Sequence, residues 1–169
     1  MHPLDIFFKT ISRLGEYHPT IRRRKAMTQL VAEDIPYRDG GDPAHTLDLH
    51  APLNPSGKLP VLLYVHGGGF RILSKNTHRA IARHFALGGY LVVNINYRLT
   101  PAGTFPHALQ DVCDALHWTL ENIEAYGGDP NRLVYAGESA GGNLTLSLAM
   151  LGCFERPEPW AKRVFDAQP

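Results

Sequence analysis

The sequence of 169 residues contains only two cysteines and no long apolar run. Cys113 and Cys153 fall in apolar, helix-like surroundings, so we predict two reduced core thiols rather than a disulfide. No apolar stretch approaches the roughly 20 residues of a membrane-spanning helix, and we expect no transmembrane segment. The first residues lack the basic and apolar pattern of a signal peptide, which predicts a cytoplasmic protein.

An excess of charge of either sign is also absent. The 17 Lys and Arg residues are matched by 16 Asp and Glu residues, for a formal net charge of +1. Such a balance gives no reason to expect a nucleic acid as a partner. Hydrophobic residues make up 44% of the chain, which is ordinary for a globular protein long enough to bury one core.

We expect residues 1–30 to form a helical segment ahead of the main domain. Apolar residues at helical spacing predict an amphipathic helix over residues 4–14, and a basic run, Arg22 to Lys25, follows it. One interpretation is a helix that lies on a membrane surface. The other, which the sequence alone favours, is a solvated helix face. The apolar side could also be a cap over an acyl pocket or ordinary packing.

Apolar strands alternate with helices over residues 31–169, which we assign to the main domain. Strands are expected at 31–38, 45–50, 60–65, 90–95 and 133–136, and helices at 75–87, 106–125 and 140–152. This alternation predicts an α/β fold, with a mostly parallel sheet, helices on both faces and an antiparallel start. A turn is expected at Gly127-Gly128-Asp129-Pro130.

A possible nucleophile lies directly after the strand at 133–136. The pattern Gly137-Glu138-Ser139-Ala140-Gly141 is G-x-S-x-G. Such a turn from strand to helix presents the serine hydroxyl at the edge of a sheet, with a helix N-terminus behind it that favours negative charge. A glycine- and serine-rich helix start could give the same pattern by chance, but the preceding strand favours the catalytic interpretation.

A glycine-rich loop, His66-Gly67-Gly68-Gly69-Phe70, directly follows the strand at 60–65. Consecutive glycines let backbone N–H groups point at one position, and each such donor to an oxyanion can be worth about 3–4 kcal/mol in rate. A plain loop or a phosphate cradle are the alternatives. A phosphate loop would need either the lysine and Ser/Thr of a P-loop or a G-x-G-x-x-G pattern, and neither motif is present.

Three further motifs lie between the glycine loop and the elbow in the sequence. They are Asn96-Tyr97-Arg98-Leu99-Thr100-Pro101, Phe105-Pro106 and Gly127-Gly128-Asp129-Pro130-Asn131-Arg132. Over about residues 60–152 the sequence resembles the hormone-sensitive-lipase-like esterases, a group of α/β-hydrolases. Two small departures are Glu138, where the family often has Asp, and Thr100, where it often has Ala. Neither changes the serine.

The resemblance implies a carboxylic ester hydrolase that acts on small-molecule esters through an acyl-enzyme, without a metal or another cofactor. It implies that Ser139 is the nucleophile and that the oxyanion hole is formed by the N–H groups of Gly68, Gly69 and Ala140. Supporting roles in the two motifs fall to His66, Gly67, Gly137 and Gly141. His66 is expected to brace the glycine loop rather than act as the base.

No histidine follows Ser139, although the acid and the histidine of an α/β-hydrolase come after the serine in chain order. We therefore expect an N-terminal portion of a longer enzyme, truncated after the elbow helix, with negligible activity alone and an exposed apolar edge at 133–136. The alternative is an inactive hydrolase or an acyl-binding pseudoenzyme. Among the other histidines, only His107, beside Pro106, is a candidate for a role at the site, because it lies near the loop after the strand at 90–95.

Overall fold

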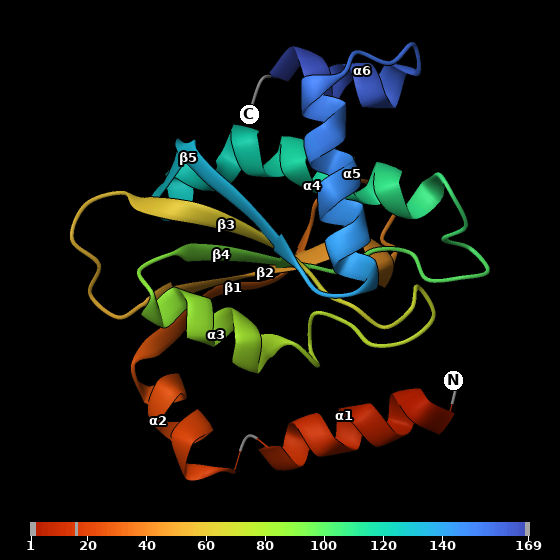
Figure 1. Cartoon of the computed structure of the whole chain (residues 1–169). Helices are drawn as coiled ribbons and strands as arrows, with labels where there is room; N and C mark the ends of the chain where they lie inside the picture. Colours follow the sequence, from red (N-terminus) through yellow and green to blue (C-terminus); the bar gives the residue numbers. More distant parts are fainter. Residues whose placement is uncertain (1–2, 16, 168–169) are drawn as a thin grey trace.

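The computed structural model describes residues 3–15 and 17–167 of the chain (Figure 1). Five strands form one sheet in the order β1-β2-β4-β3-β5. Strand β3 runs parallel to both β4 and β5, whereas β1 with β2 and β2 with β4 are antiparallel. The antiparallel start is therefore confirmed, and the sheet as a whole is mixed. The strands are β1 Thr28–Pro36, β2 Thr46–Pro52, β3 Leu59–Val65, β4 Leu91–Ile95 and β5 Gly128–Gly137.

Helices cover both faces of the sheet, as the sequence predicts. Figure 1 shows α4 and α5 on one face, with α6 beyond them, and α3 on the other face, with α1 and α2 beyond it. Two short 3₁₀ helices cover Pro43–His45 and Ile123–Tyr126. The α-helices are α1 Pro3–Gly15, α2 Pro19–Ala26, α3 Arg79–Leu87, α4 His107–Asn122, α5 Ala140–Cys153 and α6 Pro159–Ala167.

Strand β3 shows how the continuous apolar run of the sequence is used. Successive side chains of a strand point to opposite faces. Val61, Leu63 and Val65 are fully buried in the core that α4 and α5 complete. Leu62 and Tyr64 point the other way, into a smaller core that includes residues of α3. Burial on both faces explains why the strand needs no polar positions.

Two segments differ from the prediction. The expected turn at residues 127–130 is confined to Gly127, which has a left-handed φ of 86°, and β5 begins at Gly128. Gly, Asp and Pro are poor strand formers, so the sequence does not indicate this start. The C-terminal helix α6 is a second element that the sequence does not predict. It begins at Pro159, a residue favoured in the first helical turn, and it buries Ala161 and Val164.

The cysteine prediction is right for one residue and wrong for the other. Both thiols are free, and Cys113 is buried in α4, where burial raises its pKa to about 12. Cys153 is the last residue of α5 and is exposed. The apolar residues before it predict a core position, but it falls where the helix has passed the edge of the core. In the described ranges, no helix is both long and apolar enough to cross a bilayer.

Candidate active site

Ser139 lies between the last residue of β5 and the first residue of α5. Its backbone has φ 51° and ψ −117°, and the residue is exposed. A non-glycine residue in this region is strained by about 1–3 kcal/mol. Strain of this kind is typical of a nucleophile elbow, because the chain must reverse sharply to present the serine.

Gly141 explains how closely α5 approaches the sheet. A Cβ atom at this position would lie 2.0 Å from the carbonyl oxygen of Val65, the last residue of β3. A Cβ atom at Gly137 would in turn lie 2.5 Å from the carbonyl group of Gly141. Only glycine fits at these positions, so the elbow and the helix after it are packed directly against the backbone of β3.

The glycine loop has a left-handed backbone at three consecutive residues. Gly68 and Gly69 have φ values of 117° and 59°, and Phe70 has φ 60°. A Cβ atom at Gly68 would lie 2.1 Å from the carbonyl oxygen of Ile72. That tight turn is closed by hydrogen bonds from the N–H groups of Arg71 and Ile72 to the carbonyl of Gly68, at 3.1 and 3.2 Å.

The sheet brings this loop and the elbow side by side. Val65 and Gly137 are register partners on the parallel strands β3 and β5, so the residues that follow them leave the sheet together. A Cβ atom at Gly67 would lie 2.9 Å from the carbonyl oxygen of Glu138. Within the described residues, the N–H groups of Gly68, Gly69 and Ala140 are not among the donors of loop, turn or cap hydrogen bonds.

His66 is buried beneath this junction. Its ring stacks on Tyr97 and on His78, with centroid distances of 4.5 and 5.5 Å, and Tyr97 donates a hydrogen bond to the His66 carbonyl at 2.9 Å. Burial lowers the pKa of His66 to about 4, which keeps the ring neutral near pH 7. These contacts support the expected bracing role, which stays a prediction.

His78 is a site neighbour that the sequence did not indicate. Its Nε2 lies 2.8 Å from Oε1 of Glu138, the residue before the candidate nucleophile. The pair joins the segment before α3 to the elbow. The two residues are 60 positions apart and belong to no shared spacing pattern, so only the folded chain brings them together.

A histidine base for Ser139 is not found in the described part of the chain, where no histidine side chain hydrogen-bonds to this serine. His107 is exposed at the start of α4. Its carbonyl accepts a hydrogen bond from Arg98 at 3.2 Å. The described residues also contain no group of three or more His, Cys, Asp or Glu side chains placed to hold a metal ion.

Arg98 fixes the segment between β4 and α4 through a fully buried carboxylate. Its Nε donates to both oxygens of Asp111, at 3.0 and 2.9 Å, and its backbone N–H donates to the same group at 2.9 Å. His45 Nε2 lies 3.2 Å from Asp111 as well. Removing either partner of such a buried pair leaves an uncompensated charge. The arginine of the 96–101 motif therefore has a structural role, which is to neutralise Asp111.

Lys75 ties the segment after the glycine loop to the sheet. Its side chain is buried, and Nζ lies 2.5 Å from Asp48 of β2 and 2.6 Å from Asp34 of β1. Its backbone N–H donates to the side chain of Asn96 at 2.8 Å. The loop that carries Gly68 is therefore held at both ends, by β3 and by this buried ion pair.

Residues 62–160 match the family described as alpha/beta hydrolase fold. The match spans more than half of the chain, and the chain belongs to this family. The resemblance to the hormone-sensitive-lipase-like esterases is also confirmed by its relatives.

Carboxylesterase NlhH from Mycobacterium tuberculosis is 44% identical over 94 residues, which cover 55% of this chain and 30% of that protein. Phenmedipham hydrolase from Pseudarthrobacter oxydans is 40% identical over 111 residues, covering 62% and 22%. Among solved structures, a bacterial heroin esterase superposes with a TM-score of 0.76 at 29% identity, over 88% of this chain and 46% of that one. The chain thus spans less than half the length of these relatives.

Proposed function

We propose that this chain supplies the nucleophile and the oxyanion hole of a serine carboxylesterase. The observation that carries the proposal is the strained backbone of Ser139 at the end of β5, beside the glycine loop at the end of β3. The two loops follow neighbouring parallel strands and begin at the same edge of the sheet. An α/β-hydrolase has its nucleophile and its oxyanion donors at this edge. The esterases among its relatives support the reaction class.

In this mechanism the Ser139 hydroxyl oxygen attacks the carbonyl carbon of an ester, and its proton passes to a general base. The negative charge that develops on the carbonyl oxygen is met by the N–H groups of Gly68, Gly69 and Ala140. Ala140 is the first residue of α5, where helix N–H groups lack partners within the helix. The tetrahedral intermediate then expels the alcohol and leaves an acyl group on Ser139, which water later removes.

The general base and its acid are proposed to lie outside these 169 residues. In this fold both follow the serine in the sequence, and no histidine follows Ser139 here. A serine with an oxyanion hole but no base retains only about 10³–10⁴-fold acceleration over water. We therefore expect residues 1–169 alone to hydrolyse esters far more slowly than the complete enzyme.

The test is ester hydrolysis by the complete protein with a short-chain p-nitrophenyl ester. Replacing the nucleophile in Ser139→Ala should lower kcat by at least about 10⁴-fold. Ser147→Ala is the matched control, because Ser147 lies on α5, the helix that follows Ser139, and its hydroxyl donates to the helical carbonyl of Asn143 at 2.9 Å. A complete, folded protein without activity would instead favour an acyl-binding pseudoenzyme, and activity that survives Ser139→Ala would overturn the assignment of the nucleophile.

A further inference from the structure

The ring of His78 is held in one orientation by its buried surroundings. His78 is 5% exposed, and its ring stacks on His66, which in turn stacks on Tyr97. Nδ1 of His78 lies 3.1 Å from the carbonyl oxygen of Ser74. Nε2, on the other side of the ring, lies 2.8 Å from Oε1 of Glu138. A carboxylate only accepts hydrogen bonds, so Nε2 is the donor of this contact.

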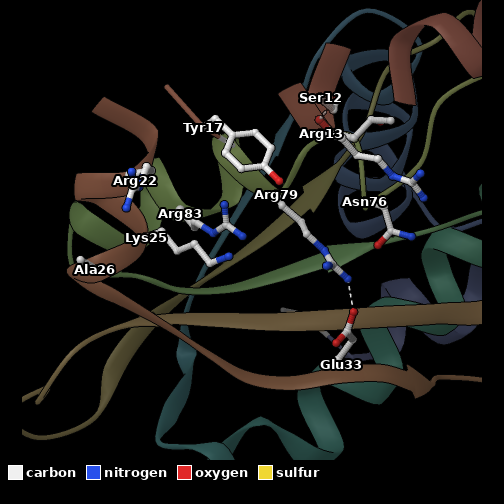
Figure 2. A pocket seen from close by; sticks show the side chains of 11 residues that line it. Ser12, Arg13, Tyr17, Arg22, Lys25, Ala26, Glu33, Asn76, Arg79 and Arg83 are labelled. Atoms are coloured by element: carbon white, nitrogen blue, oxygen red, sulfur yellow. Dashed lines mark hydrogen bonds and ion pairs between the residues drawn. The ribbon is translucent and has the colours of Figure 1, made fainter. Parts of the chain in front are cut away.

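The chain on both sides of His78 is tied to Asp48, a fully buried residue of β2. Lys75 contacts one carboxylate oxygen of Asp48 at 2.5 Å, and Arg79 contacts the other at 3.2 Å. Figure 2 shows the Arg79 side chain on the wall of a cavity, where it also pairs with Glu33 of β1. Breaking a buried ion pair leaves an uncompensated charge, so the segment that carries His78 is held firmly to the sheet.

Glu138 links His78 to both loops of the candidate site. A Cβ atom at Gly67 would lie 3.0 Å from Oε1 and 3.1 Å from Cγ of Glu138, so this side chain lies directly against the glycine loop. The Glu138 carbonyl accepts a hydrogen bond from the N–H group of Gly141 at 2.8 Å. The next residue is Ser139, with its left-handed φ of 51°. A strained backbone of this kind persists only where the surrounding structure holds it.

We propose that His78 is a positioning residue for the reaction at Ser139. Through Glu138 it fixes the elbow, which carries the nucleophile, relative to the glycine loop, which carries two of the oxyanion donors. His78 itself neither contacts the ester nor transfers a proton. This inference rests on the proposed function and deepens it. A displacement of about 1 Å in an active site can cost about 10²-fold in rate, and oxyanion donors act mainly on the transition state. Loss of the pair should therefore lower kcat and leave KM nearly unchanged.

The test is steady-state hydrolysis of a short-chain p-nitrophenyl ester by variants of the complete protein. His78→Phe keeps a flat ring that can stack on His66 but removes both ring nitrogens. It should lower kcat by about 10- to 100-fold and change KM by less than about twofold. His78→Gln keeps an N–H donor near the position of Nε2, and His78→Asn keeps one near Nδ1. The glutamine variant should recover most of the lost kcat, whereas the asparagine variant should not.

Glu138→Ala tests the other partner of the pair. It should lower kcat by about the same factor as His78→Phe, and the double variant should be no slower than either single variant, because the two residues act as a unit. His84→Phe and Glu124→Ala are the matched controls. Both residues are exposed, and Glu124 forms an ion pair with Lys58 at 2.6 Å. Both controls should keep the kcat of the parent.

Hydrogen exchange measured by mass spectrometry gives a readout that does not depend on catalysis. The peptide that contains Ser139 should exchange faster in His78→Phe and in Glu138→Ala, and as in the parent in His78→Gln. Glu138 has a half-exposed side chain, so its alanine variant is expected to fold and decides the question if His78→Phe does not fold.

The outcomes separate this role from the proposed function. An inactive parent would overturn the esterase proposal and the positioning role with it. An active parent would leave the esterase proposal standing. In that case an unchanged kcat in Glu138→Ala, additive losses in the double variant, or equal kcat values for His78→Gln and His78→Asn would overturn only the role of His78.

Discussion

At the scale of single residues, Gly141 and Gly142 are neighbours that have very different surroundings. A Cβ atom at Gly141 would meet backbone oxygen at 2.0 Å, whereas one at Gly142 would lie 3.4 Å from the carbonyl oxygen of Gly137. Gly141→Ala should therefore lower the free energy of unfolding by about 3 kcal/mol through overpacking. Gly142→Ala should be neutral or stabilising by up to about 1 kcal/mol, because alanine favours the helix.

Urea unfolding of the two alanine variants measures this difference, and their midpoints should separate clearly. If Gly141→Ala were as stable as Gly142→Ala, α5 could not be packed against the backbone of β3 as described.

Two buried histidines make stability depend on pH. Burial lowers the pKa of both His50 and His66 to about 4, and in the described structure neither ring nitrogen of His50 has a hydrogen-bond partner. Between about pH 6.5 and pH 4 the unfolded chain binds protons that these folded rings do not, so stability falls as the pH falls. From about pH 7 to pH 5 each histidine should contribute a loss of about 2 kcal/mol.

The measurement is the free energy of unfolding in urea at about pH 7 and about pH 5. His50→Leu should remove about half of the loss that the two histidines cause. His84→Gln, at an exposed position of α3, should leave the loss unchanged. A His50→Leu variant with the full pH dependence would contradict the role given to this ring.

At the scale of elements, β5 is an edge strand in the described sheet and pairs only with β3. Val134 is 45% exposed on it. Apolar edge strands promote association between chains, and a lysine on the edge opposes it. Val134→Lys should therefore increase the soluble fraction of residues 1–169 and lower light scattering on incubation.

Leu146→Lys provides the control for this effect, because it adds the same charge at an exposed position of α5 rather than on a strand edge. It should change light scattering much less. Equal improvement by both variants would mean that net charge, and not the strand edge, governs association.

Elements with a strong pattern could be predicted from the sequence. The apolar runs around Leu63 and Val93 give β3 and β4, and the spacing of Leu4 to Leu14 gives α1. The start of β5 and helix α6 could not be predicted, because their residues have weak or contrary local preferences and are fixed by tertiary packing.

The candidate site also has parts that the sequence predicts and parts that it does not. Ser139 and the glycine loop are local motifs whose backbone form follows from a few consecutive residues, and the sequence indicated both. The contacts of His78 with Glu138 and of Lys75 with Asp48 join residues that are far apart in the chain. They depend on strand order and on helix placement, which no local spacing encodes.

At the scale of the whole molecule, the sheet brings together the two loops of the candidate site. Parallel strands β3 and β5 end together, so the glycine loop and the elbow converge, and two buried ion pairs hold the loops that follow β3 and β4. The chain belongs to the alpha/beta hydrolase fold family and spans less than half the length of its relatives. We propose that the chain contributes the Ser139 hydroxyl, the group that becomes acylated.

The most direct measurement is mass spectrometry of the complete protein after reaction with a fluorophosphonate probe, which forms a covalent bond with an activated serine. We expect a single adduct, on the peptide that contains Ser139, and its loss in Ser139→Ala but not in Ser147→Ala. A folded complete protein that remains unlabelled, or that is labelled at another serine, would contradict the central claim.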